Sequence, residues 1–196
     1  MTAFPLSLLG AYLVGAIPSG VILTRLAGVG DVRQAGSGNI GATNVYRVAG
    51  RRLGILTLVC DAFKGVLPLV LVLAFGDGTP IQLALVAAAA FLGHCYPVYL
   101  GFKGGKGVAT ALGIYLVLSP LAVGGALLAF VGILWKWRYV SLASISAAAL
   151  TPFLVLLAER SLPLFLVTLG ISGMVILRHR TNIARLLDGT ETRFRA

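Results

Sequence analysis

The first residues that could do chemistry lie between Gly36 and Arg47, where the chain reads GSGNIGATNVYR. Glycines let backbone N–H groups converge, and a helix that follows such a turn adds the positive end of its dipole, so together they can hold an anion. The arginine offers a planar guanidinium that fits a phosphate group. We therefore predict a phosphate site, the alternative being a glycine-rich turn whose Ser and Asn cap an interfacial helix. Further polar contacts in this segment are available from Ser37, Gly38, Asn39, Thr43 and Asn44.

The spacing G-x-G-x-x-G, formed by Gly36, Gly38 and Gly41, also occurs in dinucleotide-binding proteins. Those proteins place it after a strand in a βαβ unit, with an acidic residue about 20 positions further on. The sequence pattern of this chain has no preceding strand and no βαβ unit, so a dinucleotide cofactor is not expected.

A second glycine-rich segment, GFKGGKG, runs from Gly101 to Gly107. It fails the Walker pattern, because Gly107 replaces the Ser or Thr that would bind magnesium, and nucleotide hydrolysis is therefore not expected. Two lysines among glycines nevertheless predict a mobile cationic loop that binds a phosphorylated ligand. A basic loop that only orients the protein in a membrane is the alternative. The residues of this second candidate site are Lys103, Gly104, Gly105 and Lys106.

A third group lies near the C-terminus, in the sequence RHRTNIAR from Arg178 to Arg185. His179 and Asn182 stand three positions apart, so on a helix they share one face. An imidazole in this place could accept a proton or a hydrogen bond. Ser141, in the basic and aromatic segment KWRYVS, is a further candidate donor. The alternative for the tail is an amphipathic helix that lies on anionic lipid.

The remaining reactive residues lie in apolar context. Asp61 and Lys64, three positions apart, predict a local ion pair, because charges in lipid are costly unless they are paired. A thioester mechanism at Cys95 is not favoured, because the adjacent His94 would point to a different face of a helix. The two His, two Cys and six acidic residues form no cluster with ligand spacing, so we expect no metal and no cofactor.

The composition indicates which solvent surrounds these groups. Hydrophobic residues make up 58% of the chain and charged residues 11%, against about 45–50% and about 25% in soluble domains. The mean hydropathy is +0.97. Sixteen Lys and Arg against six Asp and Glu give a net charge of +10, which suits anionic lipid headgroups or phosphorylated substrates and not nucleic acid. We therefore expect an integral membrane protein with a single domain over residues 1–196.

The elements that must position the polar groups are the apolar stretches of the chain. A helix needs about 20 apolar residues to cross a bilayer, and no strand-like alternation is evident, so we expect an all-α bundle. One stretch could form either one long helix or two short ones broken at Ser119 and Pro120, because proline disfavours helical continuation. The stretches lie at about 4–24, 53–75, 81–100, 108–134, 139–158 and 161–177.

The basic residues decide between one helix and two over 108–134, because Lys and Arg favour the cytoplasmic ends of membrane helices. With the break and an outside N-terminus, fourteen basic residues lie inside, Lys64 lies within a helix and only Arg160 lies outside. A single helix would move seven basic residues to the outside. We therefore predict seven transmembrane helices, an outside N-terminus, a cytoplasmic C-terminus, and short interfacial helices and polar loops on the cytoplasmic face.

Three segments resemble the bacterial membrane acyl-phosphate:glycerol-3-phosphate acyltransferase family of the PlsY type: SGNIGATNVYR, GHCYPVYLGFKGGKG and HRTNIARLLDGTE. The DAFKG segment, the length and the seven crossings are also similar, so the likeness covers essentially the whole chain. The H-x-x-x-x-D pattern of the other large glycerolipid acyltransferase family is absent, because Tyr99 and Ala184 stand five positions after the two histidines.

The resemblance implies transfer of a fatty acyl group from acyl phosphate to the 1-hydroxyl of glycerol 3-phosphate, which gives lysophosphatidic acid and inorganic phosphate in bacterial phospholipid synthesis. It implies a location in the cell (inner) membrane and a soluble partner enzyme that makes acyl phosphate. It further implies that Arg47 and Lys106 neutralise phosphates, with Ser37 and glycine N–H groups completing the cradle. His179 and Asn182 would hold the glycerol hydroxyls.

The residues agree with this activity on chemical grounds. Acyl phosphate is an activated mixed anhydride, so the enzyme must only neutralise charge, align the hydroxyl and stabilise the developing oxyanion. A substrate phosphate oxygen could take the proton. The main alternative is a transporter for phosphate or phosphorylated metabolites, but transporters carry polar residues near the midplane and open to both faces, whereas the outer loops here are short. A membrane scaffold that recruits an acidic protein is a third possibility.

Overall fold

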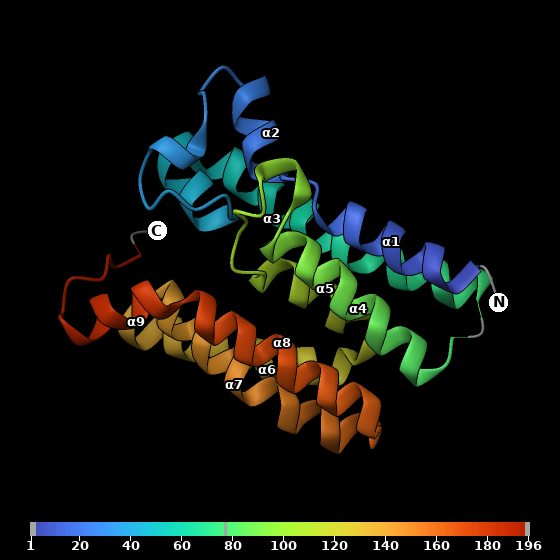
Figure 1. The fold of residues 1–196 in the computed structure, drawn as a ribbon. Helices are drawn as coiled ribbons and strands as arrows, with labels where there is room; N and C mark the ends of the chain where they lie inside the picture. Colours follow the sequence, from blue (N-terminus) through green and yellow to red (C-terminus); the bar gives the residue numbers. More distant parts are fainter. Residues whose placement is uncertain (1–2, 77, 195–196) are drawn as a thin grey trace. The chain divides into compact units, whose positions relative to one another are not determined.

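The computed structural model describes residues 3–76 and 78–194, and every regular element in this part of the chain is helical, which confirms the predicted all-α class. The helices fall into two compact units, residues 1–117 and 118–196, which are described separately (Figure 1). The first unit contains α1 (Ala3–Gly15), α2 (Ser19–Leu26), η1 (Val32–Gln34), α3 (Ala42–Phe75), α4 (Pro80–Cys95), η2 (Val98–Leu100) and, apart from its last residue, α5 (Val108–Leu118). The second contains α6 (Pro120–Trp137), α7 (Val140–Glu159), α8 (Leu162–Arg178) and α9 (Arg180–Leu187).

The first apolar stretch is not one straight helix, as the sequence predicted, but two. α1 ends at Gly15 and α2 begins at Ser19, with a 43° bend between them. Pro18 lacks an N–H group and disfavours a helical conformation at the preceding residue, so the helix stops there. The break exposes the backbone carbonyl of Ile17, which accepts a hydrogen bond from Lys64.

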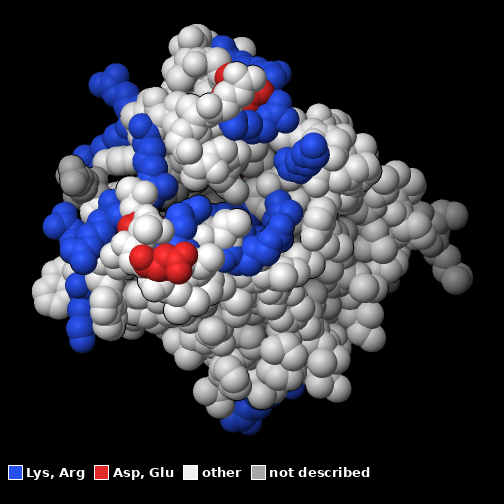
Figure 2. Space-filling model, turned by 60° about the vertical axis from the view of Figure 1, so that its left-hand side comes forward, with Lys and Arg blue, Asp and Glu red and all other residues white. Residues whose placement is uncertain are grey.

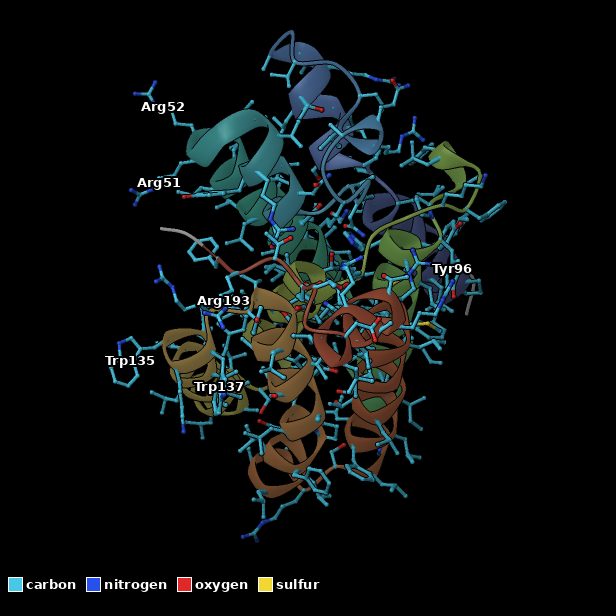
Figure 3. All side chains as sticks on the ribbon, turned by 90° about the vertical axis from the view of Figure 1, so that its left-hand side faces the viewer. Arg51, Arg52, Tyr96, Trp135, Trp137 and Arg193 are labelled. Carbon is cyan, nitrogen blue, oxygen red and sulfur yellow. The ribbon has the colours of Figure 1, made fainter. Side chains whose placement is uncertain are left out.

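α3 begins earlier than predicted, at Ala42 instead of about residue 53. Residues 42–49 form a separate first part, because Gly50 has φ 85° and ψ 175° and the helix bends there. Only glycine adopts such a conformation readily. Arg51 and Arg52 follow the bend and point away from the ribbon of α3 (Figure 3). The polar segment 28–52 is therefore partly helical, and Arg47 lies on a helix and not on a loop.

Glycines allow the helices of the first unit to approach closely. A Cβ atom on Gly15 of α1 would clash with the backbone of Ala90 in α4, and one on Gly93 of α4 would clash with the backbone of Tyr12. In membranes, helices use small residues in this way because lipid provides no hydrophobic force between them, so close van der Waals packing must hold them together.

The predicted break within residues 108–134 is confirmed, because α5 ends at Leu118 and α6 begins at Pro120. In the second unit, α7 packs against both α6 and α8, and α9 contacts α7 and α8 (Figure 1). α8 and α9 meet at His179 with a bend of 55°.

Several helices are long and apolar enough to cross a membrane. α5 has 11 residues and so covers about 16 Å, less than the ~30 Å of a hydrocarbon core. The bent pairs α1–α2 and α8–α9 raise the number of candidate spans in the described residues from four to six if each pair crosses once. The seven crossings remain a prediction. The four single spans are Ala42–Phe75, Pro80–Leu100, Pro120–Trp137 and Val140–Glu159.

Candidate active site

The first predicted phosphate segment is held together by the amide of Asn44. Its Nδ2 atom donates to the carbonyls of Val32, Ala35 and Asn39 at 3.1, 3.1 and 2.9 Å. Its Oδ1 atom accepts from the backbone N–H of Ser37 at 2.8 Å. The side chain is only 2% exposed. The sequence predicted Asn44 as a substrate contact, but its amide is already engaged, so the structure gives it the role of shaping the loop.

The predicted cradle of backbone N–H groups is also partly occupied by the protein itself. The N–H of Gly38 donates to the carbonyl of Ala35 at 3.1 Å. The N–H of Gly41 donates to Oδ1 of Asn39 at 2.8 Å, so this side chain stabilises the turn. Contacts with a ligand must therefore come mainly from side chains. Those that stay at least partly exposed here are Ser37, Thr43 and Arg47.

Arg47 differs from Arg25 and Arg33, the two arginines that precede this loop. Its side chain is exposed, and within the described part of the chain no ion pair or hydrogen bond holds its guanidinium. Arg25 and Arg33 instead pair with Asp31, at 2.8 and 2.6 Å. The hydrogen bond from Arg33 holds the pKa of the Asp31 carboxyl well below its usual range. Lys and Arg make up most of the charged residues on the face drawn in Figure 2. The guanidinium of Arg47 is exposed and available to bind an anion.

The second glycine-rich segment is closely packed and not the freely mobile loop that the sequence predicted. The N–H of Gly105 donates to the carbonyl of His94 at 3.1 Å, and a Cβ atom on this glycine would collide with the His94 ring. A Cβ atom on Gly104 would collide with the carbonyl oxygen of His94. Lys106 is half-buried, whereas Lys103 is exposed. The glycines are therefore needed because the segment that carries Lys106 lies directly against the end of α4.

A small apolar cluster connects the two segments within the first unit. Its buried members include Val32, which precedes the first segment, and Ile40 and Val45, which lie inside it. Leu100, immediately before the second segment, packs against the same cluster. The structure thus joins the two predicted phosphate segments into one packed region.

The third predicted group lies in the second unit, where the helix breaks at His179. This residue ends α8 and precedes α9 with φ −94° and ψ 6°, so Asn182 lies within α9 and His179 directly before it. The two residues still belong to one turn, because the N–H of Asn182 donates to the carbonyl of His179 at 2.8 Å. Nδ1 of the buried imidazole lies 2.8 Å from the carbonyl of Val175. In a neutral ring, Nδ1 therefore carries the proton and Nε2 the lone pair.

Glu191 organises this third group. Its Oε1 atom accepts from the hydroxyl of Ser141 and the amide of Asn182, both at 2.7 Å. Its Oε2 atom accepts from Nε of Arg185 at 2.7 Å. Burial by itself would raise the pKa of the Glu191 carboxyl, but the hydrogen bonds from Arg185, Ser141 and Asn182 outweigh it and lower that pKa below its usual range. One carboxylate thus joins α7, α9 and the tail.

The tail beyond α9 also lies along the turn between α6 and α7. The N–H of Phe194 donates to the carbonyl of Arg138 at 2.6 Å. Arg193 (labelled in Figure 3) donates to the hydroxyl of Tyr139 at 3.2 Å and lies 5.6 Å from the centre of its ring. At the end of α6, Trp135 is 85% exposed, as expected for an aromatic residue at a membrane interface.

The comparison with known proteins decides the family. A family model described as glycerol-3-phosphate acyltransferase matches residues 5–189. The chain belongs to the glycerol-3-phosphate acyltransferase family. It is 62% identical to the glycerol-3-phosphate acyltransferase of Syntrophotalea carbinolica and 52% identical to that of Trichlorobacter lovleyi, in both cases over 196 residues and the full length of both chains.

Solved structures of glycerol-3-phosphate acyltransferases agree with this assignment. The crystal structure of PlsY (YgiH), an integral membrane glycerol 3-phosphate acyltransferase, in its glycerol 3-phosphate form matches with a TM-score of 0.93 and 42% identity, over 98% of this chain and 96% of that chain. Its lysophosphatidic acid form matches with a TM-score of 0.90 and 41% identity. The predicted PlsY-type resemblance is confirmed, and the chain is a multi-pass membrane acyltransferase.

In this acyltransferase the predicted site residues fall into two groups, one in each unit. The first unit offers cations, and the second offers neutral hydrogen-bonding groups, two of which, Ser141 and Asn182, donate to Glu191. Sequence reasoning missed Glu191 as the organiser of the second group, although the scarcity of acids, six in the whole chain, was a usable signal. The first group contains Ser37, Gly38, Asn39, Thr43, Asn44, Arg47, Lys103, Gly104, Gly105 and Lys106, and the second contains Ser141, His179 and Asn182.

Proposed function

We propose that this acyltransferase moves a fatty acyl group from acyl phosphate to the 1-hydroxyl of glycerol 3-phosphate, which releases inorganic phosphate and lysophosphatidic acid. The observation that carries the proposal is the packed pair of cationic segments, which presents the exposed Arg47 and the half-buried Lys106 from a single unit. Both proposed substrates carry a phosphate group. The glycerol 3-phosphate and lysophosphatidic acid forms of PlsY support the acceptor and the product.

The reaction forms one ester bond and breaks one anhydride bond. The glycerol oxygen attacks the acyl carbonyl carbon, the bond from that carbon to the phosphate oxygen breaks, and phosphate leaves with the electron pair. The hydroxyl proton passes to a phosphate oxygen of the substrate. Because the anhydride is already activated, alignment and charge stabilisation suffice and no acyl-enzyme is needed.

In the first unit, Arg47 and Lys106 neutralise the substrate phosphates and stabilise the negative charge that develops as phosphate leaves. Other residues of the two segments either contact the substrates directly or hold the backbone of the segments in place, as the hydrogen bonds of Asn44 do. The contact residues are Ser37, Thr43 and Lys103. The residues that shape the backbone are Gly38, Asn39, Asn44, Gly104 and Gly105.

In the second unit, His179 and Asn182 hold the glycerol hydroxyls, with Ser141 beside them. Nε2 of the imidazole has a lone pair when Nδ1 donates to Val175, so it can accept a hydrogen bond from a hydroxyl group. The carboxylate of Glu191 sets the orientation of the Asn182 amide, because it accepts from the amide nitrogen. These groups are suited to orient the hydroxyls of the acceptor.

The proposed setting is the bacterial inner membrane, with both units acting as one polytopic domain over residues 1–196 and the site at the cytoplasmic face. The seven-crossing topology with an outside N-terminus is supported by the fourteen basic residues that it places inside. A cytoplasmic site would be accessible to a soluble enzyme that supplies acyl phosphate. In a cysteine-free background, single cysteines at Thr43 and Thr192 should both resist an impermeant thiol reagent in intact cells. Labelling of the Thr192 position from outside would contradict this topology.

Turnover by the purified protein in detergent tests the reaction. With acyl phosphate and glycerol 3-phosphate, phosphate and lysophosphatidic acid should appear in equal amounts, without nucleotide and in excess chelator. The Cys60→Ala/Cys95→Ala variant should keep this activity, because the mechanism uses no thiol. A transporter would catalyse no reaction in detergent. Phosphate release without the lipid product would contradict acyl transfer.

A further inference from the structure

The first unit contains a buried cluster of ionisable side chains that the proposed reaction does not use. The ammonium of Lys64 lies 2.9 Å from Oδ1 of Asp61, which confirms the predicted ion pair, and Nδ1 of His94 lies 4.0 Å from the same oxygen. None of the three side chains is more than 5% exposed. Charges inside an apolar bundle are costly, and in membrane proteins they are usually functional. We name these residues the Asp61 cluster.

The Asp61 cluster is connected to the first phosphate segment through the beginning of α2. The ammonium group of Lys64 donates to the carbonyl of Ile17 at 2.9 Å, at the break that precedes α2. The buried hydroxyl of Ser19, the first residue of α2, interacts with the Asp61 carboxylate. The next residue, Gly20, packs so closely against the carbonyl of Ile40 that a Cβ atom would clash. Because Ile40 lies within the first phosphate segment, a shift of α2 would move that segment.

The same cluster is connected to the second phosphate segment through the end of α4. The carbonyl of His94 accepts the N–H of Gly105 at 3.1 Å, and the His94 ring leaves no room for a side chain at position 105. Lys106 is the next residue. Any displacement of His94 would therefore be transmitted to the lysine that neutralises phosphate in the proposed reaction.

We propose that Asp61 is a positioning residue for acyl transfer, which holds α2 and the end of α4 so that Arg47 and Lys106 meet the substrate phosphates in the correct geometry. This inference rests on the proposed function of the two segments. One carboxylate is suited to this role because it contacts Lys64, Ser19 and His94, whose elements lead to both segments. Small displacements of catalytic groups reduce rates strongly. The rate gained by holding these groups in place can therefore offset the free-energy cost of burying the charges.

The test separates positioning from a merely structural role. Asp61→Asn leaves the Lys64 ammonium buried without its counter-charge, so both stability and activity should fall. The double variant Asp61→Asn/Lys64→Met removes both charges, and the midpoint of thermal unfolding should return close to the wild-type value, because neutral replacement of a buried pair is often tolerated. The KM for glycerol 3-phosphate should nevertheless stay raised about tenfold or more, because the hydrogen bonds to Ile17 and the carboxylate are gone.

A double variant with wild-type stability and a KM within about twofold of wild type would overturn the positioning role. Ser19→Ala provides a second, milder measurement, because it removes the polar contact of the Ser19 hydroxyl with Asp61 and leaves both charges in place. It should raise KM about two- to tenfold with unchanged thermal stability, and an unchanged KM would likewise overturn the proposal. Thr57→Val is the matched control, since Thr57 is buried in α3 one turn earlier but bonds only to the carbonyl of Leu53 in its own helix.

Lys106→Ala, measured beside these variants, distinguishes a failure of this inference from a failure of the proposed function. If kcat/KM falls in Lys106→Ala while the double variant keeps a normal KM, only the positioning role is wrong. If Lys106→Ala keeps its kcat/KM, the phosphate-binding role of the second segment is wrong, and the inference falls with it.

Discussion

Two buried carboxylates, Asp61 and Glu191, hold their surroundings together in different ways. Asp61 lies inside α3 and meets a full opposite charge, the ammonium of Lys64, which is also buried. Glu191 lies in the tail beyond α9 and accepts hydrogen bonds from the neutral groups of Ser141 and Asn182, with the half-exposed Arg185 at its other oxygen.

The difference reflects the environment of each acid. Within an apolar bundle, a carboxylate without a charged partner would be too costly to keep ionised. At Glu191, the partly exposed Arg185 reduces that cost, so neutral donors can bind the remaining carboxylate oxygen and are oriented by it. The Asp61 region thus supports charged groups, and the Glu191 region arranges neutral ones. The predictions below test this division of roles.

The largest effect is expected for the cations of the first unit. Arg47→Ala and Lys106→Ala should each reduce kcat/KM by about 10²–10³-fold, the loss expected for one preorganised electrostatic group. Arg47→Lys should recover only part of the rate, because lysine keeps the charge but loses the planar fork. Arg52→Ala, an exposed arginine on the same helix, is the control. Steady-state kinetics in detergent provide the measurement, and a loss of less than about tenfold would remove these residues from the electrostatic role.

A smaller effect, on stability and its pH dependence, is expected for Glu191→Gln. The free energy of unfolding should fall by about 1.5–3 kcal/mol at neutral pH, because hydrogen bonds to a charged group are replaced by bonds to a neutral one. The pKa of the Glu191 carboxyl is lowered from its ordinary 4.5 in the folded protein. Its contribution is therefore fully present above pH 4.5 and is lost as the pH falls through the lowered value.

Thermal unfolding of wild type and Glu191→Gln over a pH series measures this contribution. The difference between the two proteins should be constant near neutrality and shrink below the ordinary carboxyl pKa. A difference that grows on acidification would have the wrong sign for a carboxylate stabilised in the folded state.

Asn44→Ala should reduce stability by about 1–3 kcal/mol, because it leaves several backbone groups of the first segment without partners. KM for glycerol 3-phosphate should rise as well, since the segment loses its shape. Thr43→Ala, at the neighbouring position, should change the free energy of unfolding by about 0.5 kcal/mol or less. Equal destabilisation in both variants would show that the amide does not hold the segment.

The smallest loss of activity is expected for His179→Asn, because we assign His179 to positioning and a substrate phosphate to proton transfer. The variant should keep a rate within about tenfold of wild type and preserve the acidic limb of the rate–pH profile, whereas loss of a general base would reduce the rate about 10²–10⁴-fold and remove that limb. If the limb disappears with glycerol 3-phosphate binding unchanged, His179 is the base.

Much of the fold could be predicted from local patterns. The break between α5 and α6 was visible because Pro120 stands in an apolar stretch, and the helical class followed from the lengths of those stretches. The break at Pro18 lay within an apolar run and was missed, although the same rule applies to it. The start of α3 was missed because the residues around it are polar and glycine-rich, and its first turns are stabilised by the packing of Val45 in a cluster with Val32 and Ile40.

The sequence by itself determined the apolar class, the surplus of cations and the three segments whose residue types suit phosphate and hydroxyl groups. These properties depend on composition and short spacings, which a chain carries before it folds. Only the tertiary structure decided which of these groups are engaged by the protein and which can face a ligand. Asn44 is occupied by its own loop, Gly105 is required by the ring of His94, and Glu191 gathers Ser141 and Asn182 from elements 50 and 9 residues away. Such contacts depend on distances between segments remote along the chain, and no local pattern encodes them.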